Sequence, residues 1–413
     1  MAHPAPNPGS AAQPWDAAAF RSFTLPVENN RLPGPALLES IPNKDWARPV
    51  TETDAIVALI ALFEREGYAR IEPPVLQPAD VFIDLSGEDI RRRMFVTQDA
   101  SGAELCLRPE YTIPVCLQHL ARHGAQPSGY SYGGPVFRMR PGESGEFLQA
   151  GLESIGRPDV SAVDAEILAL ALDGLKQIGA PAPTVKLGDM GLLHALIDAL
   201  GIAPAAKRRV IRAIVSGQGL ESLGEPEGAG QQEHAGLLAA IEGQAPQAAK
   251  AFVEDILSIA GIARVGGRSA GEIAERFLAR AANRTGLPEE ARQVLERYLT
   301  IAGDPDQAAH AVRTLAKDAG LDLGGALSLF EERTGFMAAR GLDVRTFSFA
   351  ATFARNLDYY TGFIFEVQDT RRSDGKPIVG GGRYDRLLEH LGAEAPIPAV
   401  GCSFWLDRIV GRP

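Results

Sequence analysis

Residues 354–385 constrain the fold of this chain more than any other stretch. They read ARNLDYYTGFIFEV, then QDTRRSDGKP, then IVGGGRYD. The aromatic and β-branched run Phe363–Val367 predicts a largely buried strand. Asp374–Gly375 predicts a turn, and residues 378–382 predict a second strand that leads back. The stretch therefore predicts a buried hairpin.

Polar side chains precede the first predicted strand, where a packed sheet should be apolar: Arg355, Asp358, Tyr359 and Tyr360. Buried charge is costly unless it is paired or meets a ligand. The three glycines at 380–382 remove side chains nearby, which fits the close approach of a ligand or of a second backbone. The hairpin therefore predicts a pocket wall. A structural ion pair between Arg355 and Asp358, with a bulge at the glycines, explains the spacing equally well.

ARNLDYYTGFIFEV followed by GGGRYDRLLEHLG resembles the two histidine-specific motifs of histidyl-tRNA synthetases and their non-aminoacylating relatives. The resemblance implies an α+β fold with a class II aminoacyl-tRNA synthetase-like core, an antiparallel sheet flanked by helices. It makes the hairpin one wall of an amino-acid pocket. It also implies that four residues contact bound histidine: Arg355, Tyr359, Tyr360 and Tyr384.

LRPEYT at residues 107–112 matches a further signature of this family. The match implies that Glu110 and Thr112 contact the amino group of histidine. From the residues alone, a loop followed by a capped helix over 112–123 is the preferred interpretation.

Residues 130–156 predict two antiparallel strands joined by a loop, and they resemble the second class II motif. Gln149 and Glu153 lie four apart, hence on one face of a strand. They match the pair that reads the histidine side chain and amino group, and a carboxylate is the group expected to face a cationic ligand. By the same resemblance, Arg138 is the arginine that holds a phosphate of ATP.

The nucleotide side departs from the family pattern. Arg140 replaces the glutamate expected to contact adenine, and the loop arginines are absent, with Glu143 and Glu146 in a shortened loop. Acids beside a polyphosphate repel it. Residues 398–408 resemble the third class II motif, with Arg408 at a position that contacts ATP phosphate and Asp407 in place of glutamate. We therefore expect an intact histidine-reading side, with Arg138 and Arg408 as a vestigial nucleotide site.

The length of 413 residues suggests two or three domains. We expect a flexible N-terminal tail over 1–29, the first part of the synthetase-like core over 30–190, a helical insertion over 191–342 and the second part of the core over 343–413. No anticodon-binding domain is expected after the third motif.

Composition narrows the class of protein. The net charge of −11 argues against a large nucleic-acid footprint. No apolar run approaches the ~20 residues of a membrane span. The three cysteines have no zinc-like spacing and read as buried thiols of a cytoplasmic protein. We expect no metal and no cofactor.

Smaller elements are also predicted. An apolar stripe predicts a helix over 51–66 with Thr51 at its start and Gly67 at its end. Residues 94–107 predict a hairpin, and a helix is predicted over 161–178. By resemblance, the first class II motif joins two copies of the core into a dimer around Pro74.

In its shortened nucleotide loop, and in the expected absence of an anticodon-binding domain, this chain resembles the synthetase-like regulatory subunits of ATP phosphoribosyltransferase. This family implies a chain without catalytic residues that activates a short-form catalytic subunit, in a hetero-oligomer of the hetero-octamer type. It implies L-histidine as ligand, a part in histidine feedback, and no tRNA. Two alternatives are a truncated histidyl-tRNA synthetase or histidine-adenylating enzyme, and a scaffold with a non-functional pocket.

Overall fold

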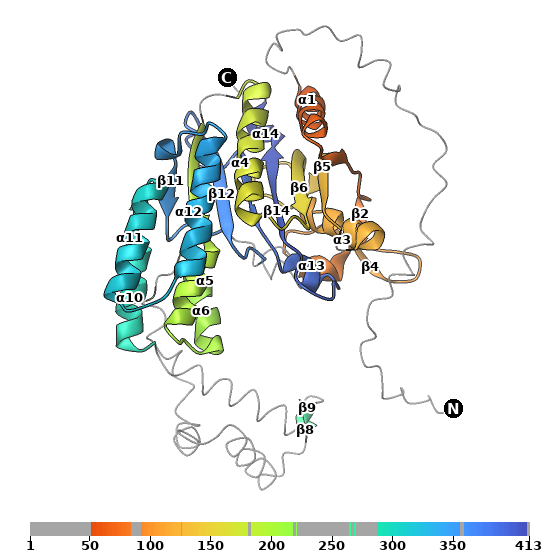
Figure 1. The fold of residues 1–413 in the computed structure, drawn as a ribbon. Coiled ribbons are helices and arrows are strands. Elements are labelled where there is room, and N and C mark those ends of the chain that lie inside the picture. The colour runs from red at the N-terminus through yellow and green to blue at the C-terminus, as the bar shows by residue number, and fades with distance from the viewer. Residues whose placement is uncertain are drawn as a thin grey trace. The chain divides into compact units, whose positions relative to one another are not determined.

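The computed structural model describes residues 51–83, 92–124, 126–180, 183–217, 220, 264–265, 268–269, 287–355 and 359–410. The chain forms two compact units (Figure 1). The first contains the described residues within 1–163, 167–183 and 369–413, and the second those within 164–166 and 184–368. The predicted tail over 1–29 and Asp358 lie outside the described residues.

The first unit contains a sheet with the strand order β1-β5-β6-β14-β13. Its strands are β1 Ala69–Arg70, β5 Ser128–Phe137, β6 Glu146–Ile155, β13 Val379–Arg383 and β14 Ala399–Trp405. The β5–β6, β6–β14 and β14–β13 pairs are antiparallel, and β1 pairs with β5 in parallel. The expected antiparallel core is therefore confirmed.

Helix α1 (Glu52–Arg65) begins where the sequence predicts. The Thr51 hydroxyl accepts a hydrogen bond from the Asp54 amide at 3.1 Å, and the Asp54 carboxylate accepts one from the Thr51 amide at 3.1 Å. Leu59 and Phe63 are fully buried. The Phe63 ring centroid lies 5.9 Å from that of Phe404 in β14, so the apolar stripe packs on the sheet.

A small sheet with the order β2-β4-β3 belongs to the same unit. It consists of β2 Leu76–Pro78, β3 Val96–Gln98 and β4 Glu104–Leu107, and the predicted hairpin turn lies between β3 and β4. The Asp99 carboxylate accepts hydrogen bonds from the Ser101 and Ala103 amides, which fixes the turn. The remaining helices of this unit are α3 Thr112–His123, α4 Val160–Gln177, α13 Leu387–His390 and α14 Leu406–Ile409.

The second unit has its own strands and helices. The strand order is β12-β7-β11-β10, with β7 Pro183–Asp189, β10 Ala302–Gly303, β11 Ser348–Ala350 and β12 Phe363–Asp369. The described helices of this unit include α5 Met190–Ala199, α6 Pro204–Val215, α10 Glu289–Leu299, α11 Pro305–Asp318, α12 Gly324–Ala339 and the short 3₁₀ helix η5 Val344–Thr346. Two further short strands, β8 Arg264–Val265 and β9 Arg268–Ser269, pair with each other. In Figure 1, α11 lies beside α10 and α12.

A buried ion-pair cluster joins elements of the second unit. Arg333 in α12 is 5% exposed, and its guanidinium lies 2.7 Å from Asp189 and 3.2 Å from Asp164. Asp189 also accepts a hydrogen bond from the Leu192 amide at 3.0 Å and so caps α5. Pairing compensates the burial of these charges.

Several local predictions can be compared with the structure. Strands β12 and β13 lie where the hairpin predicts them, and Gly375 between them has a φ of +63°. The range 191–342, predicted as helical, also contains strands β8, β9 and β10. Helix α13, which follows Tyr384, covers a single turn. None of the helices in the described ranges has the length and apolar composition to span a membrane.

Candidate functional site

Glu153 lies at the centre of a buried cluster in the first unit. It sits on β6 with 1% of its surface exposed. Its carboxylate accepts hydrogen bonds from the Thr112 hydroxyl at 2.8 Å and from the Tyr132 hydroxyl at 3.1 Å. The Tyr384 hydroxyl donates a third, short hydrogen bond to the other oxygen. We call Glu153, Thr112, Tyr132 and Tyr384 the carboxylate cluster.

Four elements bring this cluster together. Thr112 is the first residue of α3, Tyr132 lies on β5, and Tyr384 follows β13. The register places Gly401 of β14 opposite Glu153, and Ser403 opposite Gly151. Tyr132 and Ser403, which form a hydrogen bond, are 271 residues apart in sequence, so only the sheet topology makes them neighbours.

Glycine makes room for the Glu153 carboxylate. A Cβ atom added at Gly401 would lie 1.5 Å from Glu153 Oε2. A Cβ atom added at Gly151 would lie 2.4 Å from the Tyr132 hydroxyl oxygen. Each glycine is therefore required by the close approach of a polar side chain of the cluster.

Burial changes the proton affinity of the cluster. Burial raises the pKa of Glu153 to about 8, against the opposing effect of the hydrogen bonds from Tyr384 and Thr112. Burial likewise raises the pKa of Tyr384 well above its usual value. With a pKa of about 8, Glu153 is largely protonated at neutral pH, and a cationic ligand would favour its ionised form.

Gln149 is a second buried polar residue on the strand that carries Glu153. It lies on the same face of β6 as Glu153 and is 2% exposed. Its Oε1 atom is buried and accepts no hydrogen bond from the described part of the chain. A buried acceptor without a donor is costly, so this oxygen is suited to a ligand N–H. The structure thus brings Glu153, Thr112 and Tyr384 of the predicted set together and places Gln149 on the same strand face.

Glu110, which is predicted to contact histidine, also accepts hydrogen bonds from the start of α3. Its carboxylate accepts hydrogen bonds from the Thr112 amide at 2.5 Å and from the Ile113 amide at 2.9 Å, the first amides of α3. Tyr111, the residue that precedes the helix, makes no side-chain cap. Burial raises the pKa of Glu110. The capped helix inferred from the residues alone is confirmed, and contact of Glu110 with histidine stays a prediction.

Arg138 and Arg408, the predicted nucleotide residues, lie in the first unit. The Nε atoms of both are buried and have no hydrogen-bond partner among the described residues. Burial lowers the pKa of Arg138 to about 10; the Glu110 charge opposes this shift, and the Arg408 and Arg140 charges add to it. Arg408 donates a hydrogen bond to the Pro377 carbonyl at 2.7 Å. The two guanidiniums retain the ability to bind an anion.

Arg140 is held by internal contacts. Its Nη1 atom lies 2.8 Å from Asp407 and 3.0 Å from Glu143, and its Nε atom donates to the Ser144 carbonyl at 2.9 Å. Its guanidinium carbon lies 3.8 Å from the centroid of the Phe147 ring. Arg140, Asp407 and Glu143 all depart from the family pattern in the sequence. In the structure, Asp407 and Glu143 are the ion-pair partners of Arg140.

Arg355, Tyr359 and Tyr360 form a group in the second unit. Arg355 Nη1 lies 3.1 Å from the Glu366 carboxylate and 3.3 Å from the Phe365 carbonyl oxygen. Its guanidinium carbon is 5.8 Å from the Tyr360 ring centroid, and the two tyrosine rings are 4.9 Å apart. Glu366 is thus one carboxylate partner of Arg355. The ion pair with Asp358 that the sequence suggested lies outside the described residues and stays a prediction.

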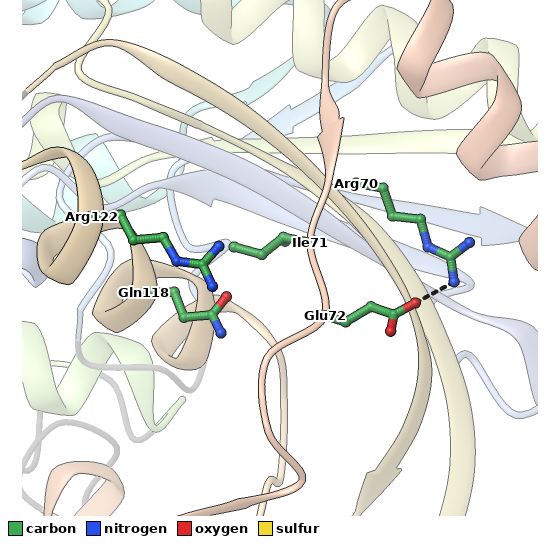
Figure 2. A pocket seen from close by; sticks show the side chains of 5 residues that line it. All are labelled: Arg70, Ile71, Glu72, Gln118 and Arg122. Atoms are coloured by element: carbon green, nitrogen blue, oxygen red, sulfur yellow. Dashed lines mark hydrogen bonds and ion pairs between the residues drawn. The ribbon is translucent and has the colours of Figure 1, made fainter. Parts of the chain in front are cut away.

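A separate open hollow lies beside β1 and α3. It has a volume of about 470 Å³ and is lined by Arg70, Ile71, Glu72, Gln118 and Arg122. Figure 2 shows Arg70 and Glu72 paired with each other, while Gln118 and Arg122 extend from α3 towards Ile71. None of the sequence-predicted site residues lines this hollow. Within the described ranges, no group of three or more His, Cys, Asp or Glu residues is placed to hold a metal ion.

Sequence reasoning missed Tyr132, Ser403 and Gly401. Tyr132 stands two residues after Tyr130 in a predicted strand, and this alternation indicates a shared face without showing what that face meets. Gly401 had a usable signal, because a glycine inside a predicted strand often marks a close approach. Ser403 donates to or accepts from the Tyr132 hydroxyl at 2.8 Å, and no local pattern indicates that contact.

Comparison with known proteins gives consistent results. The histidyl-tRNA synthetase family profile matches residues 50–262 and 272–409. A protein from Brucella ovis named ATP phosphoribosyltransferase regulatory subunit is 40% identical over 346 residues, which cover 82% of this chain and 92% of that protein. A protein of the same name from Brucella abortus is 40% identical over 82% of this chain and 91% of its own length.

Solved structures share the fold. An ATP phosphoribosyltransferase regulatory subunit/histidyl-tRNA synthetase from Bacillus halodurans matches with a TM-score of 0.61 at 22% identity, over 87% of this chain and 77% of that one. Histidyl-tRNA synthetase from Nostoc sp. PCC 7120 matches with a TM-score of 0.58 at 18% identity, over 86% of this chain and 70% of that one. The class II synthetase-like fold expected from the motifs is confirmed.

Proposed function

The chain belongs to the histidyl-tRNA synthetase-like family of ATP phosphoribosyltransferase regulatory subunits, and on this premise we propose that it activates a short-form catalytic subunit of that transferase. The proposal places it in the first step of L-histidine biosynthesis, with histidine as the ligand through which the end product controls the step. In this proposal the chain has no catalytic residue of its own.

The observation that carries the proposal is the carboxylate cluster with its neighbour Gln149. A buried carboxyl group and an unpartnered amide oxygen on one strand face provide acceptors for a small cationic ligand. Histidine has an ammonium group and an imidazole N–H, so its donors fit these acceptors. Glu110, Arg355, Tyr359 and Tyr360 are proposed to complete the contacts of the bound amino acid.

Control by histidine requires that it bind two states of the complex with different affinity. A pocket in one subunit that is coupled to the active site of another meets this requirement without any chemistry in the pocket itself. The assembly proposed is a hetero-octamer of dimers of this chain, joined through the synthetase-like core, with short-form catalytic subunits. We place it in the cytoplasm, and no tRNA takes part.

The decisive experiment measures phosphoribosyl transfer from phosphoribosyl pyrophosphate to ATP. The short-form catalytic subunit of the same source is assayed alone, with this chain, and with this chain and histidine. Stimulation that histidine reverses is the expected result. A folded, histidine-binding chain that leaves the rate unchanged would overturn the proposal.

A second candidate, a histidine-adenylating enzyme, is favoured by the unpartnered Nε atoms of Arg138 and Arg408. Histidine-dependent exchange between ATP and pyrophosphate tests it directly. We expect exchange at the background rate, because the charges of Glu143 and Asp407 act on Arg408, one of the two arginines that a triphosphate would need. Exchange well above background would favour the enzyme.

A further inference from the structure

The face of β6 that carries Gln149 and Glu153 continues to Phe147. Residues 147, 149, 151 and 153 alternate with the residues of the opposite face, and the pairing of β6 with β5 is unbroken over this range. Phe147 is therefore about 7 Å from Gln149 along the strand. A ligand that extends from the carboxylate cluster past Gln149 along this face therefore reaches the Phe147 ring.

Guanidinium groups cover that ring. The Arg140 guanidinium carbon lies 3.8 Å from the ring centroid and the Arg138 carbon 5.0 Å. Phe147 is 4% exposed, and the Arg140 side chain is 14% exposed. The planar guanidinium of Arg140 thus takes up a stacking position on Phe147.

Contacts from separate segments fix Arg140 there. Asp407 comes from α14, Glu143 and the Ser144 carbonyl from the loop before β6. Glu143 in turn pairs with Lys376 from the segment before β13. An arginine held by two carboxylates and a carbonyl does not leave the ring without breaking all three contacts.

We propose that Arg140 is a specificity-determining residue that keeps purine nucleosides and nucleotides out of the pocket by occupying the stacking surface of Phe147. Aromatic side chains bind nucleic-acid bases through their ring faces, and this face is already filled. The site is thereby limited to a ligand of amino-acid size. This inference deepens the proposed histidine site and rests on the same strand face.

The competing explanation is that Arg140 is only an ion-pair partner of Asp407 and Glu143. Lysine would satisfy that role, since it carries the same charge, but it has no plane to stack on the ring. The two explanations therefore predict different behaviour for Arg140→Lys. Under our proposal, both Arg140→Ala and Arg140→Lys expose the Phe147 ring.

The test uses adenosine as probe, because it carries the purine ring without phosphates that Asp407 and Glu143 would repel. Adenosine binding is measured by equilibrium dialysis for the full chain and for Arg140→Ala, Arg140→Lys and Arg386→Ala. Arg386 forms an exposed ion pair with Glu389 at 3.0 Å, so its variant controls for loss of a surface arginine. Thermal unfolding and histidine binding confirm that each variant keeps its fold and its pocket.

We expect the unaltered chain and Arg386→Ala to bind adenosine weakly, and Arg140→Ala and Arg140→Lys to bind it about tenfold more tightly or better, the range expected for one base stack. Equal adenosine affinity in the unaltered chain and both Arg140 variants overturns the inference. Gain of binding in Arg140→Ala but not in Arg140→Lys also overturns it, because charge would then be the cause. Activation of the catalytic subunit is measured separately, so failure of one proposal is distinguishable from failure of the other.

Discussion

The two ends of one face of β6 are built from opposite kinds of interaction. At the Glu153 end, neutral hydroxyl groups surround a single carboxyl group, and between the two ends the Gln149 Oε1 atom accepts no hydrogen bond from the described residues. At the Phe147 end, Arg140 pairs with both Asp407 and Glu143, and only the Oδ1 atom of Asp407 accepts no hydrogen bond from the described residues. A carboxyl group surrounded by neutral hydroxyls can still pair with a cationic ligand, whereas carboxylates that already face an arginine gain less from one.

The largest expected effect is a loss of histidine affinity that occurs on substitution at the Glu153 end and not at the Phe147 end. Glu153→Ala should weaken histidine binding by ~2–5 kcal/mol, because it removes the charged partner of the ligand. Glu143→Ala, at the other end of the same face, should leave histidine affinity nearly unchanged. Isothermal titration calorimetry measures both, and a Glu153→Ala variant with unaltered affinity would remove the pocket assignment.

A smaller effect tests how tightly the Glu153 end is packed. Gly401→Ala places a Cβ atom 1.5 Å from Glu153 Oε2 and 2.6 Å from the Leu152 carbonyl oxygen. We expect the free energy of unfolding to fall by ~1–3 kcal/mol, the usual cost of overpacking. Gly335→Ala in α12 is the control, since a Cβ atom there meets nothing within 4 Å, and it should raise stability by up to ~1 kcal/mol. Urea unfolding compares the two, and equal midpoints would contradict the packing argument.

The effect that is smallest within any one pH unit is a dependence of stability on pH that comes from the Glu153 end. Burial raises the pKa of Glu153 from 4.5 to about 8, so between these values the folded chain holds a proton that the unfolded chain has lost. The free energy of unfolding therefore falls as pH rises through this window, by up to ~1.4 kcal/mol per pH unit. Glu153→Gln removes this contribution and should flatten the dependence measured by urea unfolding at several pH values. Parallel curves for the two proteins would show that Glu153 is ionised in the fold.

Local structure was predictable wherever neighbouring residues determine it. The hydrogen bonds between Thr51 and Asp54, the turn at Asp374–Gly375 and the shared face of Gln149 and Glu153 all follow from spacing within a few residues. The class II fold followed from the order of motifs. Each of these features depends on contacts that are short in sequence or on a resemblance that spans the core.

Partners across the chain were not predictable in the same way. Arg140 and Asp407 are 267 residues apart and meet because β6 and β14 are neighbours, which no local pattern encodes. The sequence indicated that both positions depart from the family pattern without indicating that they compensate each other. Glu110 shows a different limit, because a residue matched to a ligand role also serves the backbone of α3.

The absence of a side chain at Gly401 has a consequence for how this protein can diverge. Because the space of a Cβ atom at 401 is filled by the Glu153 carboxylate, the two positions share one volume. A side chain gained at 401 while glutamate stays at 153 lowers stability, whereas a shorter residue at 153 first makes room for one. Once both positions have changed, reversion at either position alone does not restore the pocket, so the pair is easier to lose than to regain.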